Sequence, residues 1–402
     1  MHAEEETAPD GAVGQRVAVQ RKLAGLTQYQ LAARAHVSKS LIGQVERGVV
    51  PASPAFTAAA ARALRIDVEM LYEQPHWSAI DSKADHAAIS ALRTALDCVD
   101  DPVLASPPMS AAELRVKLDD CEHDRAQSRY AQIAAKLPEL LQHAFAIVAD
   151  ARPGFDAENA WSLLSDAYML AQTVSFRFRH FDLAAQSNDR WRLATAHSGD
   201  PLRAATAAYQ RGALRLFRGD YTGVLRIMER AHSEIADEQS PATNSVRTQL
   251  HLRQAIAYAR SGAADRADEH IDAARELVTR GIPANPYYDV IATLTNVELH
   301  WVAVPVELCD GTTAVGRAER IQTPERDEPS RAGRHWIDVA RAWTLHGNRA
   351  KALESLDSAR RIAPQLTRYH PQVHETVHIL AERDRRVTDS LAGFARWVGV
   401  HL

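Results

Sequence analysis

The chain has 402 residues, of which 46% are hydrophobic, 24% are charged and 6% are aromatic. These values exclude a largely disordered chain, and the few aromatics argue against a β-sandwich or barrel and favour helices packed through Ala and Leu. The formal net charge of −4 excludes a polybasic protein that coats nucleic acid without selectivity.

The N-terminus and the cysteines indicate where the protein works. Residues 1–11 are acidic and polar, so they are expected to form a disordered arm without the apolar core of a signal peptide. The sequence contains no run of about 18 apolar residues, so no membrane span is predicted. Cys98, Cys121 and Cys309 are scattered and odd in number, which argues against a disulfide framework or a cysteine zinc site. We therefore expect a cytoplasmic protein with no membrane association.

Residues 12–74 carry short helical periods separated by turn signals. Thr27 and Ser38 are predicted N-caps, and Gly25 and Gly48 are predicted to end helices. Between residues 11 and 75, eight basic residues outnumber four acidic ones. The pattern predicts a small basic domain of five short helices, the fifth following Asp67.

The rest of the chain is predicted to be helical as well. Residues 75–124 are expected to form a helical connector broken at Asp97–Pro108, a stretch rich in Asp and Pro. Residues 125–402 contain helical pairs at a period of about 40 residues, which predicts an α-solenoid of tetratricopeptide-like hairpins. The fold class is therefore predicted to be all-α. The hairpin turns are marked by Gly219, Gly262 and Gly347, and more weakly by Phe178–Ala185. The spacing between Gly262 and Gly347 leaves room for an unmarked repeat around Val304 and Pro305.

The most specific motif lies between Gln15 and Leu71. Its main part is Leu26-Thr27-Gln28, followed by Val37-Ser38-Lys39-Ser40-Leu41-Ile42-Gly43-Gln44-Val45-Glu46-Arg47-Gly48. This pattern resembles the Cro/CI-type (XRE) helix-turn-helix family. The resemblance implies a domain that binds double-stranded DNA, with a second helix over Thr27–Arg34 and a recognition helix over Ser38–Arg47.

The residue types on the recognition helix fit that role. Val37, Ile42 and Val45 supply a buried face, and polar residues lie opposite, where such helices enter the major groove. Lys39 suits guanine and Gln44 suits adenine. Basic residues nearby can neutralise phosphates, and Glu46 is expected to pair with Arg47. The candidate DNA-binding residues are Gln28, Lys39, Ser40, Gly43, Gln44, Arg16, Arg21, Lys22 and Arg47.

The order of the two parts is similar to that of the peptide-responsive regulators grouped as RRNPP and of long actinobacterial XRE regulators. In those relatives the array dimerises and binds a signalling peptide, so the resemblance implies a quorum-sensing homodimer with a peptide or small-molecule effector. The first helix of each hairpin is expected to line a concave groove. The candidate ligand-binding residues are Tyr168, Gln172, Tyr209, Arg211, Arg253, Gln254, Asn296 and His300.

A second motif, His374-Glu375-Thr376-Val377-His378, fits the HExxH pattern of zinc peptidases. In that pattern two histidines one turn apart hold the metal and the glutamate acts on a metal-bound water. Gly and His are missing where the metzincin continuation requires them, at Ala381 and Asp384. We therefore expect an amphipathic helix and no metal, with a zinc metallopeptidase as the second alternative.

Our interpretation is a non-enzymatic, sequence-specific transcriptional regulator without a cofactor. It is expected to bind an inverted-repeat operator as a homodimer, because one small domain reads only half a site. The array is expected to sense the effector. The first alternative is an interaction protein whose array docks a partner protein, with DNA binding serving only to recruit it.

Overall fold

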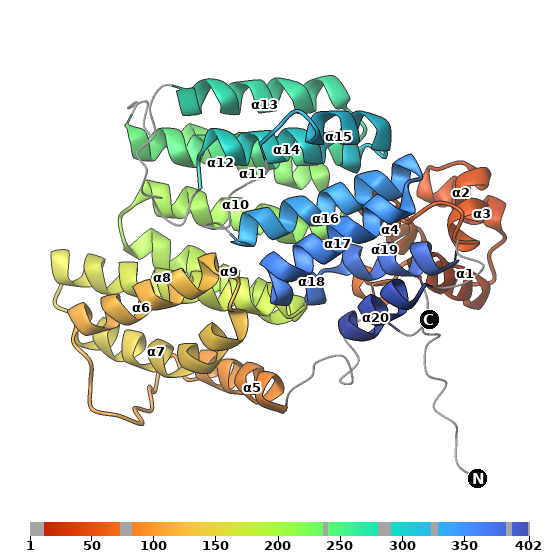
Figure 1. Cartoon of the computed structure of the whole chain (residues 1–402). Helices are drawn as coiled ribbons and strands as arrows, with labels where there is room; N and C mark the ends of the chain where they lie inside the picture. The colour runs from red at the N-terminus through yellow and green to blue at the C-terminus, as the bar shows by residue number, and fades with distance from the viewer. Residues whose placement is uncertain are drawn as a thin grey trace, which may run out of the picture.

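The computed structural model describes residues 12–72, 83–235, 240–279, 291–322, 329–382 and 388–400. Within these ranges every regular element is helical, which confirms the predicted all-α class (Figure 1). In the same part of the chain, no helix combines the length and the apolar character needed to cross a membrane. The expected disordered arm, residues 1–11, and the first part of the expected connector, residues 75–82, lie outside the described residues.

The N-terminal domain consists of short helices with local caps. Its elements are α1 (Val13–Leu23), α2 (Gln28–Ala35), α3 (Lys39–Glu46), α4 (Pro54–Leu64) and the 3₁₀ turn η1 (Val68–Met70). Both predicted N-caps are confirmed, because the Thr27 and Ser38 hydroxyls accept hydrogen bonds from backbone N–H groups three residues later. The predicted fifth helix is a single 3₁₀ turn, held on either side by the buried Val68 and Leu71.

The remaining helices form one array that stacks upward from α5 to α13 and then returns beside the N-terminal domain (Figure 1). Its helices are α5 (Lys83–Asp97), α6 (Ala111–Ala126), α7 (Tyr130–Asp150), α8 (Phe155–Arg177), α9 (Phe181–His197), α10 (Pro201–Phe217), α11 (Tyr221–Glu234), α12 (Pro241–Arg260), α13 (Ala264–Thr279), α14 (Leu294–Glu307), α15 (Gly311–Ala318), α16 (Pro329–His346), α17 (Arg349–Ile362), α18 (Pro364–Tyr369), α19 (Pro371–Glu382) and α20 (Asp389–Val398).

The five hairpins from α8–α9 to α16–α17 each turn on one residue in the left-handed conformation, and these residues recur about every 40 positions. Glycine takes this role in three turns, where φ is +74° at Gly219, +84° at Gly262 and +95° at Gly347. Two other turns use Arg179 (φ 66°) and Cys309 (φ 61°) instead. The Cys309 turn joins α14 to α15, so a hairpin occupies the expected unmarked repeat. Without glycine, neither turn carried the strong sequence signal.

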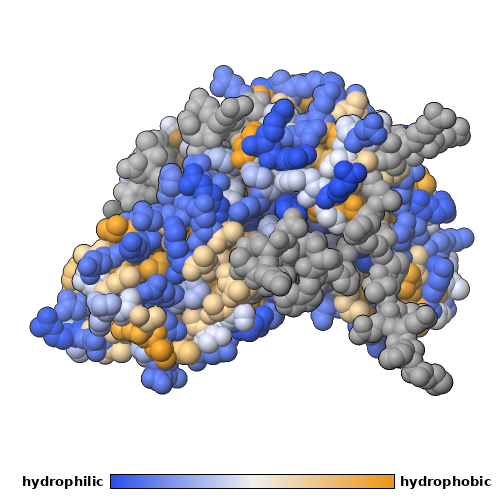
Figure 2. All heavy atoms as spheres, turned by 60° about the horizontal axis from the view of Figure 1, so that its bottom comes forward, coloured by the Kyte–Doolittle hydropathy of each residue, from blue (hydrophilic) through white to orange (hydrophobic). Residues whose placement is uncertain are grey.

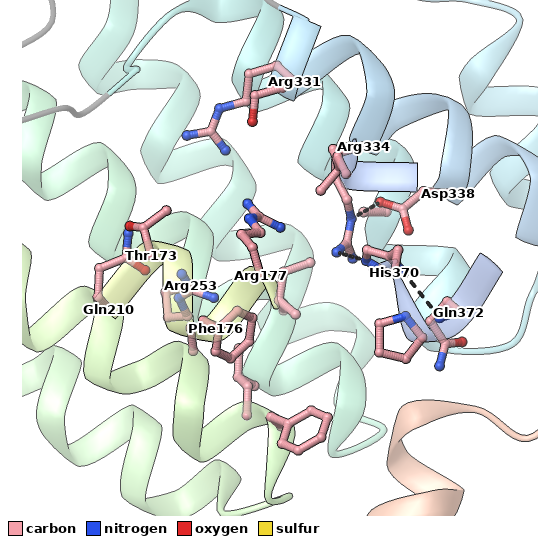
Figure 3. A pocket seen from close by; sticks show the side chains of 18 of the residues that line it. Thr173, Phe176, Arg177, Gln210, Arg253, Arg331, Arg334, Asp338, His370 and Gln372 are labelled. Carbon is pink, nitrogen blue, oxygen red and sulfur yellow. Dashed lines mark hydrogen bonds and ion pairs between the residues drawn. The ribbon is translucent and has the colours of Figure 1, made fainter. Parts of the chain in front are cut away.

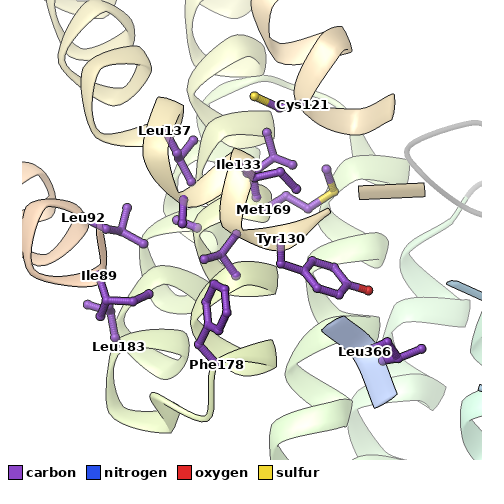
Figure 4. Close-up of a cluster of buried hydrophobic side chains, with 14 of the residues drawn as sticks. Ile89, Leu92, Cys121, Tyr130, Ile133, Leu137, Met169, Phe178, Leu183 and Leu366 are labelled. Carbon is purple, nitrogen blue, oxygen red and sulfur yellow. The ribbon is translucent and has the colours of Figure 1, made fainter. Parts of the chain in front are cut away.

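The array closes on itself through its largest apolar core. This core joins α5–α9 to α16–α20, so that Leu366 of α18 belongs to the same cluster as Tyr130 of α7 and Phe178 at the end of α8 (Figure 4). The N–H of Ala131 also donates to Gln365 Oε1 at 3.1 Å. The array, which was expected to form a concave groove, therefore closes on itself, because its last hairpins pack against its first ones.

The predicted connector does not stand apart from the array. Leu92 of α5 and Leu114 and Leu118 of α6 are completely buried in that same large core. The Asp- and Pro-rich break does separate the two helices, which end at Asp97 and begin again at Ala111. On the face in Figure 2, hydrophilic side chains predominate and hydrophobic ones form small patches, because most apolar side chains of these helices point inward.

Three histidines stack across α11, α12 and α13. The ring centroids of His232 and His251 are 4.5 Å apart, and the Nδ1 atoms of His251 and His270 are 2.9 Å apart. Burial lowers the pKa of His251 to about 3 and that of His232 to about 4. Both rings are therefore neutral when folded, but they titrate near pH 6.5 when unfolded. The other polar groups facing this cluster are Arg247, Gln254, Tyr258, Arg266 and Glu269.

We predict that stability falls as the pH drops through 6.5, because the unfolded chain then binds protons that the folded histidines reject. His251→Gln should reduce this loss by at most about 1.4 kcal/mol per pH unit. Urea unfolding at pH 7 and pH 5 measures the effect, with the exposed His346→Gln as the control. An identical pH dependence in the wild type and His251→Gln would contradict the assignment.

Candidate functional site

The predicted recognition helix α3 lies on the outer edge of the molecule (Figure 1). Lys39 and Ser40 are exposed, and Gln44 is half-buried with its Nε2 donating to Ser40 Oγ at 3.4 Å. On the inner face, Ile42 and Val45 are buried in the domain core, as expected. The face predicted to read DNA is therefore open to solvent.

Glu46 lies at the centre of a hydrogen-bond network that joins α1, α2 and α3. Arg21 donates to its carboxylate from Nε at 2.6 Å and from Nη2 at 3.0 Å, and Gln28 Nε2 donates at 2.8 Å. The hydrogen bond to Glu46 raises the pKa of Arg21. The ion pair expected between Glu46 and Arg47 is thus made by Arg21, because Arg21 lies in the interface while Arg47 is exposed.

The other candidate DNA-binding residues differ in exposure. Arg16 is only 8% exposed, and its Nε donates to the Leu71 carbonyl at 2.8 Å, so it holds the end of the domain in place. Gly43 is buried beside the side chains of Gln28 and Arg47. Lys22, like Arg47, is exposed. The residues best placed for phosphates are therefore Lys22 and Arg47, and DNA contacts of all these residues stay predictions.

The N-terminal domain is anchored to the array by Glu375 of α19. Its Oε2 accepts the N–H of Val13 at 3.0 Å, and its Oε1 accepts the N–H of Ala52 at 2.9 Å. Glu375 is 3% exposed, and burial raises the pKa of its carboxylate. These two N–H groups begin α1 and precede α4, so one side chain holds two helix ends of the domain.

The HExxH motif thus has a structural role in the fold. Both carboxylate oxygens of Glu375 are engaged by the N-terminal domain. The Nε2 of His374 is hydrogen-bonded to the Arg368 carbonyl at 2.8 Å, and His378 is 7% exposed. The histidines were expected at the surface, but His378 is buried and His374 is half-buried, because the N-terminal domain and the preceding turn cover this helix. A zinc peptidase would need these same groups for the metal and its water.

A cavity of about 290 Å³ lies at the centre of the closed array (Figure 3). It is lined by the first helices of the hairpins, as the sequence predicts, and also by Pro54 and Tyr72 of the N-terminal domain. Five of the eight candidate ligand-binding residues line it. They are Gln172, Tyr209, Arg253, Asn296 and His300.

The other three candidates lie elsewhere on the same helices. Tyr168 is 3% exposed and packs against Phe145 in the large core. Arg211 pairs with Asp189 at 3.5 Å, and Gln254 contacts His232 at 3.2 Å. The sequence identified helices that line the cavity, but not the direction of each side chain. It also missed lining residues from α16 and α18, above all Arg331, Arg334 and Tyr369.

Tyr72 connects the cavity to the N-terminal domain. Its ring stacks on Phe217 of α10 with the centroids 5.3 Å apart. Its carbonyl accepts a hydrogen bond from Arg179 Nη2 at 2.7 Å, and its hydroxyl lies 3.5 Å from Gln372 Nε2. Burial raises the pKa of the Tyr72 hydroxyl to about 12. The last residue of the described domain is therefore part of the cavity wall.

Comparison with known families decides the nature of the first domain. Residues 12–74 match a family model described as "Helix-turn-helix domain". The N-terminal domain is a helix-turn-helix domain. This confirms the XRE-type motif predicted from the sequence.

One solved structure shares a likeness with the chain. It is Bacillus thuringiensis PlcR, solved in complex with the peptide PapR7 and DNA, at 14% sequence identity and a TM-score of 0.26, over 67% of this chain and 97% of that one. The comparison with curated proteins finds no match.

We predict that Glu375→Ala loosens the helix-turn-helix domain from the array. The change leaves two buried N–H groups without an acceptor, and each unpaired group destabilises the docked arrangement by about 1–3 kcal/mol. Hydrogen exchange of the Val13 and Ala52 amides should accelerate, whereas Glu354→Ala on the exposed face of α17 should leave it unchanged. If both amides stayed as protected as in the wild type, Glu375 would not be the anchor.

Proposed function

We propose that the protein is a sequence-specific transcriptional regulator whose array dimerises and binds an effector in its central cavity. The observation that carries the proposal is the shared cavity wall: helices of the array and Pro54 and Tyr72 of the helix-turn-helix domain line one space. A ligand in that space contacts both parts of the molecule. It can therefore favour one arrangement of the DNA-binding domain over another.

The route from the cavity to the DNA-binding face is short. A ligand that displaces Phe217 or Arg179 acts on Tyr72, through the ring stack and the carbonyl hydrogen bond. Tyr72 follows Leu71, whose carbonyl is held by Arg16 of α1. The change in DNA affinity is bounded by the ligand's preference between the two arrangements, typically about 1–3 kcal/mol.

The array also provides a means of pairing two DNA-binding domains. One domain presents a single recognition helix and reads half a site, so high affinity calls for a second copy. We propose a homodimer on an inverted repeat, by analogy of domain order with the peptide-responsive XRE regulators. The cytoplasm is the proposed location and no enzymatic step is proposed. The alternative of an interaction protein that docks a partner through its array does not account for the arginine-lined cavity that the array shares with the helix-turn-helix domain.

We predict that Lys39→Ala and Gln44→Ala each weaken operator binding by about 1–3 kcal/mol and relax preference at one base pair. Genomic footprinting first supplies the operator, and fluorescence anisotropy then measures the affinity of each variant. Lys117→Ala, an exposed lysine on α6, is the matched control and should bind as the wild type does. Wild-type affinity and base preference in both α3 variants would remove α3 from the reading role.

We also predict that the protein sediments as a dimer and that the footprint is an inverted repeat. Its half-sites should lie about 34–36 Å apart or at a multiple of this spacing, because two recognition helices must reach the same face of the duplex. Analytical ultracentrifugation and the footprint test this together. A monomer that binds a single half-site with full affinity would overturn the dimer.

A further inference from the structure

The central cavity has an unusual balance of charge. Seven arginines line it, against Asp338 as the one acidic lining residue of the described chain. Several of these arginines are paired: Arg260 with Glu307, Arg334 with Asp338, and Arg125 with Glu122. The seven are Arg125, Arg177, Arg179, Arg253, Arg260, Arg331 and Arg334.

Two of these arginines, Arg177 and Arg253, have no carboxylate partner among the described residues. Arg177 lies 5.5 Å from the Tyr130 ring centroid, and Arg253 lies 4.0 Å over that of Tyr209. Burial lowers the pKa of both guanidinium groups, and the charges of Arg331 and Arg334 lower them further. Burying cations beside other cations is unfavourable unless an anion joins them.

Figure 3 shows how these charges are directed. Arg177 points into the cavity from α8, while Arg331 and Arg334 approach from α16 on the other side. Arg334 is held in place by Asp338 at 3.0 Å and by His370 at 2.7 Å. The arginines of two facing helices thus converge on one space.

Buried polar atoms supply a second, independent indication of a ligand. Gln249 Oε1, Asn296 Oδ1 and His335 Nδ1 have no hydrogen-bond partner among the described residues, although the three side chains are 2%, 1% and 4% exposed. The Arg253 Nε is likewise without a partner. Such orphaned groups are rare in folded proteins, and each calls for a partner such as a bound ligand, an ion or water. All four residues line this cavity.

The cavity also has an aromatic wall and a limited size. Phe181 and Phe217 stack with centroids 4.1 Å apart, and Phe176 meets both edge-on. This wall continues to Tyr72 of the helix-turn-helix domain. The cavity volume of about 290 Å³ lies near the lower end of the range of small-molecule sites, about 300–1,000 Å³. The size suits a small organic molecule.

We propose that this cavity binds a small organic carboxylate, with its anionic group between Arg177 and Arg253 and its apolar body on the Phe176–Phe217 wall. The inference rests on the proposed effector role and names the chemical class of the effector. The carboxylate neutralises the buried cations, and its remaining polar atoms meet Gln249 and Asn296. An apolar or cationic ligand of the same size would leave the arginines uncompensated.

The test uses matched probes that differ only in charge. Indole-3-acetate and indole-3-acetamide represent a metabolite, and Leu-Phe and Leu-Phe-amide represent a peptide C-terminus. Calorimetric titration of the full chain without DNA should give at least about tenfold tighter binding of one carboxylate than of its amide, as expected for a charge-assisted pair. Which pair shows the preference identifies the source of the carboxylate.

The variants connect this preference to the two arginines. Arg177→Met and Arg253→Met should each abolish it, Arg177→Lys should retain part of it, and Arg211→Met, outside the cavity, should leave it unchanged. Arg177→Met should also raise the melting temperature without ligand, because it removes cationic repulsion. Equal or undetectable binding of acid and amide in both pairs, or an unchanged preference in both Met variants, would overturn the proposal. Carboxylate binding that leaves operator affinity unchanged would instead contradict only the effector role.

Discussion

The position of the DNA-binding domain depends on one buried carboxylate. Glu375 accepts N–H groups from two helix ends that lie more than 300 residues away along the chain. Removing either partner would leave an unpaired polar group in a nearly dry interface, which costs about 1–3 kcal/mol. It fixes the domain by α1 and by the turn before α4, and this leaves α3 facing solvent. The predicted DNA-reading face and the contacts with the array therefore lie on different sides of the same small domain.

Local chemistry explains what was predictable from the sequence. The caps at Thr27 and Ser38 and the turns at Gly219, Gly262 and Gly347 depend on neighbouring residues, so they follow from short stretches of chain. The pairing of Glu46 with Arg21 and the role of Glu375 depend on residues brought together only by folding. The same glutamate fits a zinc-binding pattern in the sequence, which shows how weakly five residues determine their surroundings.

The cavity was partly predictable from the sequence and partly dependent on the fold. Its helices could be anticipated, because the first helix of a hairpin faces the inside of a curved array. The sequence could not show which face of each helix points inward, and Tyr168 and Gln254 consequently lie outside the cavity. The closure of the array by α18 and its neighbours depends on a core assembled from both ends of the array. Arg331 and Arg334 reach the cavity only because of that closure.

The turn at Arg179 has a mechanical consequence. A non-glycine residue in the left-handed region costs about 1–2 kcal/mol, and three sister turns avoid that cost with glycine. Here the same dihedral angle both ends α8 and directs a guanidinium to the Tyr72 carbonyl. A rotation of the α8–α9 hairpin would therefore carry the hydrogen-bond donor of the Tyr72 carbonyl with it. The backbone conformation of one repeat and the position of the last described residue of the helix-turn-helix domain thus depend on the same side chain.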